Sequence, residues 1–145
     1  MEPRVSQEDY AKYFLGFSAH SIVKDGVSYP TVEHAYHCMR YTDQNVVEEI
    51  RTAASPLLAW RISQKYKDKQ LADFPERKRE VMKELYRLKL EQHEDVKEAL
   101  LKSKGLQIVK HITSGPPADG FWDDGTDGLG RNESGKIWME LREEI

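Results

Sequence analysis

The sequence contains a single cysteine, Cys38, among its 145 residues. One cysteine excludes an intramolecular disulfide and any metal cluster that needs several thiolates. Long hydrophobic runs are also missing, because no segment approaches the roughly 18 apolar residues of a membrane-spanning helix. The first residues, Met1–Arg4, lack the apolar core of a secretory signal. We therefore expect a cytoplasmic protein with no membrane span.

The sequence has no strong excess of charge of one sign, since its formal net charge is −3. This balance excludes broad, nonspecific binding of nucleic acid but leaves room for local recognition of one nucleotide. The common phosphate-binding loops and the G-x-S-x-G nucleophile turn are absent. The five histidines show no H-E-x-x-H or other zinc spacing. The sequence predicts no metal ion and no cofactor.

The chain is long enough for one domain with a hydrophobic core, and we expect residues 1–145 to form it. Asp25–Gly26 between short β-prone runs predicts a hairpin within Ser21–Tyr29. Thr31 is a candidate cap for the helix that follows Pro30. Ser55 is likewise a candidate cap for a second helix, because Pro56 follows it at the first helical position.

The second half of the chain predicts three further helices and one strand. The helices are expected at Pro75–Gln92, at Asp95–Lys104 with Gly105 as the C-terminal cap, and around Ile137–Ile145. Leu106–Ile112 has the pattern of a buried strand. The fold class that follows is α+β: a helix-rich single domain with a small β-sheet.

The segment Phe121–Asn132 combines three aspartates, three glycines and an aromatic pair in twelve residues. Asp and Gly dominate solvated turns for local reasons. Glycine also permits close approach of a ligand, and carboxylates beside aromatic rings suit a polar, sugar-bearing molecule. The two aromatic residues favour a binding site over a simple turn.

Glu33 falls in the first turn of the Thr31 helix, where the positive helix end favours its ionised form. The 100° rotation per residue puts Tyr36, His37 and Arg40 on the same helix edge. Spacing alone favours a surface carboxylate that completes the cap. The functional alternative is a carboxylate at the rim of a pocket, beside an aromatic ring.

Lys89 falls inside the apolar stripe of the Pro75–Gln92 helix, between Met82 and Leu85. A lysine in such a position commonly extends its ammonium to water along an apolar stem. The alternatives are a charge that meets a carboxylate in a cleft, or a partly neutral amine that acts as a nucleophile.

Several segments together resemble the NADAR (NAD- and ADP-ribose-associated) family. The resemblance covers nearly the whole chain, with its elements in the family's order and spacing. Asp119–Gly125 resembles the D-x-x-W-G-x-G element of the family. The other matching segments are Gly26–Tyr36 (GVSYPTVEHAY), Val81–Met82 with Lys89, and Gly130–Lys136 followed by Met139 and Arg142.

The resemblance implies an N-glycosidase, which cleaves a bond from ribose C1 to nitrogen. A carboxylate stabilises the oxocarbenium-like transition state of such a reaction, while a general acid assists the leaving base. By motif position, Glu33 and Lys89 are the expected catalytic residues. The expected substrate-binding residues are Tyr36, Asp119, Trp122, Asp124, Gly125 and Asn132.

The family is associated with two substrate classes: ADP-ribose attached to guanine, and phosphorylated ribosylamino-pyrimidine intermediates of riboflavin synthesis. This chain departs from the family pattern at Phe14–Ser18, where the usual F-L-S-N-F-Y-P is shortened, and at Leu71–Phe74, which replaces R-x-D-W. Asp123 stands where the family has glycine. The departures at Phe14–Ser18 and Leu71–Phe74 favour ADP-ribosylated guanine, in a nucleotide or nucleic acid, over the small riboflavin intermediates. A noncatalytic ADP-ribose-binding module is the third alternative.

Overall fold

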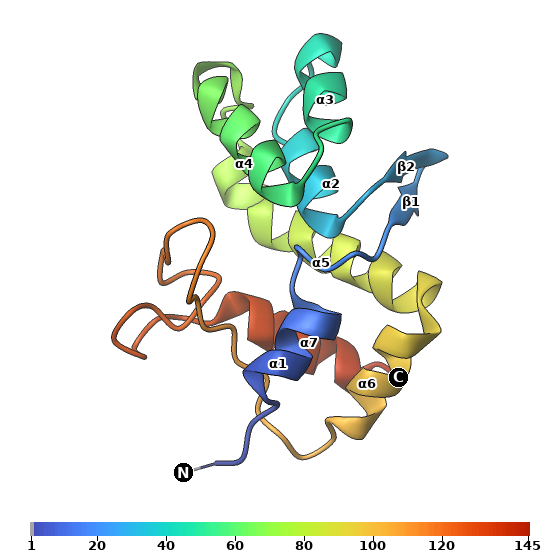
Figure 1. Ribbon diagram of the computed structural model, residues 1–145, viewed down its shortest axis with the longest axis vertical. Coiled ribbons are helices and arrows are strands. Elements are labelled where there is room, and N and C mark those ends of the chain that lie inside the picture. Colours follow the sequence, from blue (N-terminus) through green and yellow to red (C-terminus); the bar gives the residue numbers. More distant parts are fainter. Residues whose placement is uncertain (1) are drawn as a thin grey trace. The chain divides into compact units, whose positions relative to one another are not determined.

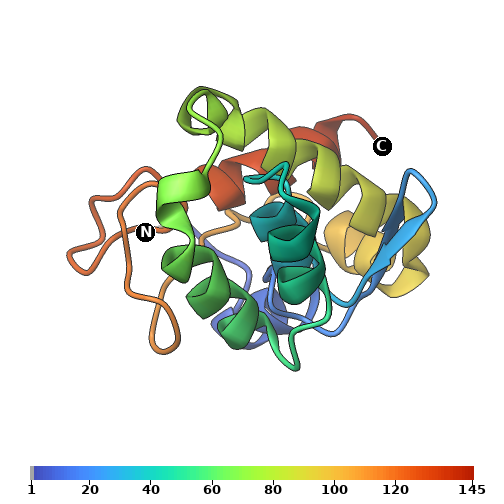
Figure 2. The ribbon, with the colours of Figure 1, turned by 90° about the horizontal axis from the view of Figure 1, so that it is seen from above.

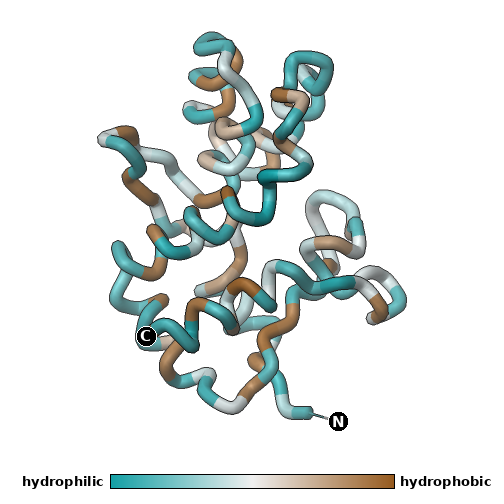
Figure 3. The backbone as a smooth tube through the Cα atoms, turned by 180° about the vertical axis from the view of Figure 1, so that it is seen from behind, coloured by the Kyte–Doolittle hydropathy of each residue, from teal (hydrophilic) through white to brown (hydrophobic). Residues whose placement is uncertain are grey.

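The computed structural model describes residues 2–145. The chain divides into two compact units, one that joins the N-terminal segment up to Ser18 with His93–Ile145, and one formed by Ala19–Gln92. Apolar residues recur at intervals along the helices, without a long apolar run (Figure 3). No helix within the described residues 2–145 has the length and apolar character needed to cross a membrane.

The Ala19–Gln92 unit begins with the predicted hairpin. Strand β1 (Ile22–Lys24) pairs antiparallel with β2 (Val27–Tyr29). The two turn residues have left-handed backbones, with φ of 50° at Asp25 and 79° at Gly26. This is the backbone that a two-residue hairpin requires, because its twist matches that of the strands. The hairpin prediction is confirmed.

Helix α2 (Val32–Cys38) is central to this unit, and all seven of its residues are buried. The Thr31 side chain accepts a hydrogen bond from the His34 backbone N–H, which confirms the predicted cap. The helix contacts α3, α4 and α5 (Figures 1 and 2). A helix enclosed on every side must satisfy its polar side chains within the protein.

Two capped helices cover α2. Helix α4 (Pro56–Lys65) begins at the predicted Ser55–Pro56 signal, and the Ser55 side chain accepts from the Leu58 N–H. A single 3-10 turn, η2 (Lys67–Lys69), follows it. Helix α3 (Gln44–Arg51), capped by Asp43, was not predicted from the sequence. Its sequence signals are the Asp43 cap and the helical spacing of Val46 and Ile50, which are buried on one face.

Helix α5 (Phe74–Gln92) confirms the longest predicted helix. Its last residue, Gln92, joins it to the hairpin: its Oε1 accepts from the Val23 N–H at 2.8 Å, and its Nε2 donates to the Val23 carbonyl at 2.9 Å. The Gln92 side chain thus makes, at the free edge of β1, the two backbone hydrogen bonds that a neighbouring strand would make. The buried face of α5 comprises Phe74, Met82, Leu85, Tyr86, Lys89 and Leu90.

The other unit is built from short helical segments. These are α1 (Gln7–Asp9), the π-helical turn η1 (Tyr10–Phe14), α6 (Glu94–Lys102) and α7 (Glu133–Glu143). The Trp138 indole N–H donates to the Phe14 carbonyl at 3.0 Å, and the two rings are 5.1 Å apart. This pair joins the N-terminal and C-terminal helices of the unit. The predicted helices near 95–104 and 137–145 are confirmed.

The predicted strand at Leu106–Ile112 is wrong. The segment makes one isolated parallel bridge, between Arg4 and Gln107. Beyond that bridge, side chains and the Asp124 backbone N–H, which donates to the Lys110 carbonyl, take the place of a neighbouring strand. Asn132 Oδ1 accepts from the Lys110 N–H at 2.8 Å, Asn132 Nδ2 donates to the Ile108 carbonyl at 2.9 Å, and Gln7 Nε2 donates to the Val109 carbonyl at 2.9 Å. The apolar pattern predicted burial correctly, but no sheet is present there. The α+β class with a small sheet is confirmed, with β1 and β2 as the sheet.

A substitution at Gly135 tests the packing of α7. A Cβ at this buried helical position would overlap the Ile108 carbonyl oxygen and the Asn132 amide. We therefore expect Gly135→Ala to lower the free energy of unfolding by about 1–3 kcal/mol, despite the higher helix propensity of alanine. Chemical denaturation measures this change. The control is Lys136→Ala on the exposed face, which should change it by less than about 0.5 kcal/mol; equal effects of the two variants would contradict the packing described.

Candidate functional site

Glu33 is the second residue of α2, and only 8% of its surface is exposed. Its Oε2 lies 3.0 Å from Nε2 of His37, one turn further along the helix. The interpretation of Glu33 as a surface carboxylate is wrong, because the covering helices α3, α4 and α5 enclose the whole of α2. A carboxylate withdrawn from water interacts more strongly with neighbouring charge than an exposed one.

His37 is 2% exposed, and burial lowers its pKa because it disfavours the imidazolium, although Glu33 opposes this shift. By its geometry neither ring nitrogen makes a hydrogen bond within residues 2–145, although Nε2 lies close enough to the Glu33 carboxylate for a small rotation to form one. The neutral ring therefore lies against Glu33 without adding a full positive charge.

The other histidine of α2 has a structural environment. The Thr31 hydroxyl lies 2.8 Å from Nδ1 of His34, whose Nε2 is 3.0 Å from the Ala53 carbonyl oxygen. Both ring nitrogens are thus satisfied when Nε2 carries the proton. Cys38 on the same helix is buried, which raises the pKa of its thiol to about 12. Neither residue offers a reactive group at neutral pH.

Tyr36, an expected binding residue, is buried in an aromatic cluster on the same helix edge. Its ring lies 5.4 Å from that of Phe74 and 5.3 Å from that of His37, both edge-on. The guanidinium carbon of Arg40 lies 5.2 Å from the ring centroids of both Tyr36 and Phe74. The contribution of Tyr36 is thus to support Arg40 and His37, and its role toward a substrate stays a prediction.

Lys89 lies on the buried face of α5 and is 1% exposed. Extension of its ammonium to water is excluded by this burial. Helix α5 packs against α2, the helix that carries Glu33. A charged or nucleophilic amine is thus held in the interior of the unit that also encloses the carboxylate.

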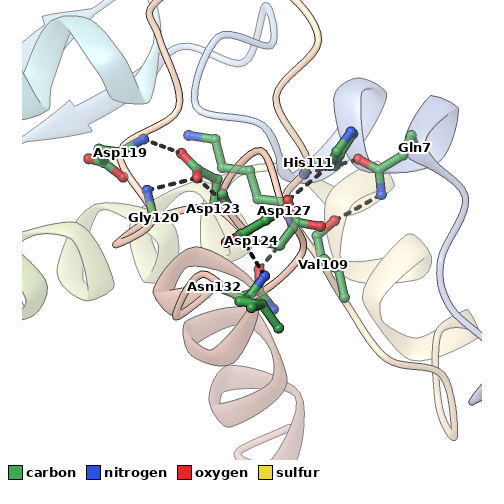
Figure 4. Close-up of polar contacts among 12 residues, drawn as sticks. Gln7, Val109, His111, Asp119, Gly120, Asp123, Asp124, Asp127 and Asn132 are labelled. Carbon is green, nitrogen blue, oxygen red and sulfur yellow. Dashed lines mark hydrogen bonds and ion pairs between the residues drawn. The ribbon is translucent and has the colours of Figure 1, made fainter.

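The loop of residues 119–132 belongs to the unit that contains His93–Ile145, and two of its aspartates, Asp119 and Asp123, accept its backbone hydrogen bonds (Figure 4). Asp119 Oδ1 accepts from the N–H groups of Phe121 and Trp122. Asp123 accepts from the N–H groups of Asp119, Gly120 and Gly125 at 2.9–3.1 Å. Burial raises the pKa of Asp123, but these bonds and the charge of Lys110 outweigh it, so the net pKa is lowered. The residue that replaces the family's glycine therefore stabilises the loop.

The same loop covers the beginning of α7. The N–H groups of residues 131–134 donate to the carbonyls of residues 120–123. Gly125 has φ of +73° and Asn132 has φ of +52°, both left-handed. The Asn132 amide is already occupied by the 108–110 segment. Gly125 and Asn132 shape the loop, and their contact with a substrate stays a prediction.

Trp122 and Asp124 are buried in this loop. The Trp122 ring packs edge-on against Phe121 at 4.7 Å, and the Arg131 guanidinium stacks on Phe121 at 4.9 Å. Asp124 Oδ1 lies 2.9 Å from Nδ1 of His111. His111 and Asp124 line a 620 Å³ pocket whose other lining residues are Glu2–Gln7. This loop therefore places one expected binding residue, Asp124, at an accessible cavity of its own unit.

Sequence reasoning missed three residues that the structure brings into the site regions. His37 and Arg40 were placed on the Glu33 edge, but neither was predicted to be a site residue. His111 was not predicted to be a site residue either. The helical spacing from Glu33 was a sufficient signal for the first two. The proximity of His111 to Asp124 depends on the fold of the loop, for which the sequence carries no signal.

The lowered pKa of His37 predicts how stability depends on pH. Below the unfolded-state value of about 6.5, the unfolded chain binds more protons than the folded one, so acidification favours unfolding. We expect the free energy of unfolding to fall between pH 6.5 and the lower folded pKa, by up to about 1.4 kcal/mol per pH unit from this group. His37→Leu should remove this part of the slope in denaturation experiments. An unchanged slope in the variant would show that His37 does not contribute.

Comparisons with known proteins agree with the sequence motifs. The family model described as "NADAR domain" matches residues 4–145. The chain is 33% identical over 140 residues to N-glycosidase YbiA of Escherichia coli (strain K12), covering 97% of this chain and 84% of that protein. It is 32% identical to riboflavin biosynthesis protein VVA0006 of Vibrio vulnificus, covering 92% of this chain and 35% of that protein.

A solved structure gives the same result for the fold. The NMR structure of the E. coli protein YbiA matches with a TM-score of 0.84 and 32% identity, covering 99% of this chain and 86% of that one. Motifs, family match and fold agree over nearly the full length of the sequence. The chain belongs to the NADAR domain family.

Proposed function

We propose that this protein is an N-glycosidase that hydrolyses the bond between ribose C1 and a nitrogen. The observation that carries the proposal is the burial of Glu33 and Lys89 on the packed helices α2 and α5. Recognition of a ligand alone does not require a buried carboxylate and a buried amine, so this arrangement favours an enzyme over a noncatalytic ADP-ribose reader. The similarity to proteins named N-glycosidase supports the same reaction.

Glu33 is the proposed electrostatic residue of the reaction. When the C1–nitrogen bond breaks, its electron pair leaves with the base. Positive charge develops at C1, shared with the ring oxygen of a closed sugar or with the attached nitrogen of the Lys89 imine in a ring-opened one. A buried carboxylate stabilises that charge more strongly than an exposed one. We propose that neutral His37, whose Nε2 lies 3.0 Å from Oε2 of Glu33, donates to the carboxylate and orients it while leaving its negative charge. The base takes up a proton, and water supplies the hydroxyl group at C1.

Lys89 has two possible roles in this scheme. As a nucleophile, its Nζ adds to C1 of a ring-opened sugar, the C1–base bond breaks, and the base leaves with a proton. Hydrolysis of the resulting imine releases the sugar and restores the amine. In the second role, the ammonium neutralises a phosphate of the substrate. Burial favours the neutral amine, whereas a neighbouring carboxylate favours the ammonium. We propose that Lys89 is the nucleophile, because a chemical function would explain why a lysine occupies an apolar stripe.

Two substrate classes carry the required bond, and different observations favour each. The departures at Phe14–Ser18 and Leu71–Phe74 favour ADP-ribosylated guanine, in a nucleotide or in nucleic acid. The names of the Vibrio vulnificus and Zea mays relatives, both riboflavin biosynthesis proteins, favour a small phosphorylated ribosylamino-pyrimidine. The proposed binding residues are the same in either case: Tyr36, Asp119, Trp122, Asp124, Gly125 and Asn132.

Glu33→Gln tests both the reaction and the residue. Wild type should release free base from one of the two substrates, as measured by mass spectrometry. Glu33→Gln should lower kcat by about a hundredfold or more, because a neutral amide cannot stabilise the developing charge. The control is Glu48→Gln on α3, whose carboxylate pairs with Arg51 at the surface and should leave kcat unchanged. Binding of ADP-ribose without release of base from either substrate would establish the reader instead.

Borohydride trapping distinguishes the two roles of Lys89. If Lys89 is the nucleophile, borohydride with substrate should leave a reduced covalent adduct that peptide mapping places on Lys89 and not on the exposed Lys65. Lys89→Arg should then lose turnover, because a guanidinium does not form the imine. No adduct, together with an active Lys89→Arg variant, would assign Lys89 to phosphate binding.

A further inference from the structure

Arg40 has no carboxylate partner within the described residues 2–145, whereas Arg51 pairs with Glu48, Arg77 with Asp73 and Arg131 with Glu133. Its buried Nε atom also has no hydrogen-bond partner there. A half-buried cation without a counter-charge is costly unless something else binds it.

The guanidinium is nevertheless held in a fixed position. It stacks on the rings of Tyr36 and Phe74, 5.2 Å from each centroid, and NH1 donates to Gln70 Oε1 at 2.8 Å. The Arg40 carbonyl also accepts from the Leu71 N–H at 2.8 Å. Two aromatic faces and one amide thus restrict the rotation of the side chain. A planar cation that is already ordered loses little entropy when an anion binds to its edge.

The position of Arg40 relates it to the proposed reaction centre. Arg40 lies two residues beyond Cys38, the last residue of α2. Its guanidinium stacks on Tyr36, whose ring contacts that of His37, and Nε2 of His37 lies 3.0 Å from the Glu33 carboxylate. This placement suits a substrate whose ribose C1 lies at Glu33 and whose phosphate extends toward the end of the helix. His37 between them is neutral and does not compete for an anion.

We infer that Arg40 binds a phosphate group of the substrate. This inference rests on the proposed function, because it places the phosphate relative to the carboxylate that acts at C1. Guanidinium matches phosphate oxygens through paired N–H donors, which a lysine cannot reproduce. Phosphate is common to both substrate classes, as a 5-phosphate on ribose or as the diphosphate of ADP-ribose. Arg40 thus acts in recognition, whereas Glu33 acts on the reacting bond.

Binding can be tested without turnover. The arginine Nε–H signals of the wild-type protein are followed by NMR during titration with ribose, ribose 5-phosphate and ADP-ribose. We expect the Arg40 signal to shift with the phosphorylated compounds and not with ribose. Stronger binding of ribose 5-phosphate would identify a monophosphate site, and stronger binding of ADP-ribose a diphosphate site. No shift with either compound would overturn the inference.

Kinetics provide the second test. Loss of charged hydrogen bonds to phosphate should raise KM on the order of 10–100-fold in Arg40→Met, with a smaller change in kcat. Arg40→Lys should recover only part of this loss. The control Arg77→Met removes an exposed arginine that pairs with Asp73, and it should leave KM unchanged. A loss of kcat in Arg40→Met with unchanged KM would make Arg40 a structural residue. Phosphate-dependent shifts without release of base from any substrate would retain the anion site and remove the proposed N-glycosidase.

Discussion

The complete burial of helix α2 is the constraint on which the Ala19–Gln92 unit depends. Its seven consecutive buried residues include Glu33, His34 and His37. Each polar group in such a helix must find a partner inside the protein, because an unpaired buried group costs free energy. His34 is satisfied by Thr31 and Ala53, and His37 lies against Glu33. The covering helices thus convert an ordinary helix-start carboxylate into a buried group with a defined orientation.

In the unit that contains His93–Ile145, the polar groups of the 119–132 loop are also paired within the protein. Its carbonyl groups accept the N–H groups at the beginning of α7, and its aspartates accept those of the loop itself. Asn132 joins the loop to the extended 108–110 segment, and Gly135 allows that segment to approach the helix. The residues that resemble a family signature are therefore also the residues that hold this loop together. Residues in such a family motif can therefore have a structural role in addition to a role in the reaction.

The sequence predicted the features that depend on neighbouring residues. The Asp25–Gly26 turn and the caps at Thr31 and Ser55 are local, and all three are confirmed. The strand at Leu106–Ile112 was wrong because its hydrogen bonds go to side chains of Gln7 and Asn132, about 100 and 20 residues away. The burial of Glu33 could not be predicted for the same reason, since distant helices create it. Lys89 was predicted to face the apolar side of its helix, and its burial agrees.

The central claim is that Glu33, oriented by His37, acts on the ribose C1–nitrogen bond. A double-mutant cycle on kcat, with Glu33→Gln and His37→Leu, tests it most directly because it isolates the interaction between the two residues. The account predicts that His37→Leu lowers kcat in the wild-type background but has little further effect when Glu33 is already glutamine. His37→Gln, which retains a donor for the carboxylate, should preserve more activity than His37→Leu. Independent, multiplicative effects of the two substitutions on kcat would contradict the account.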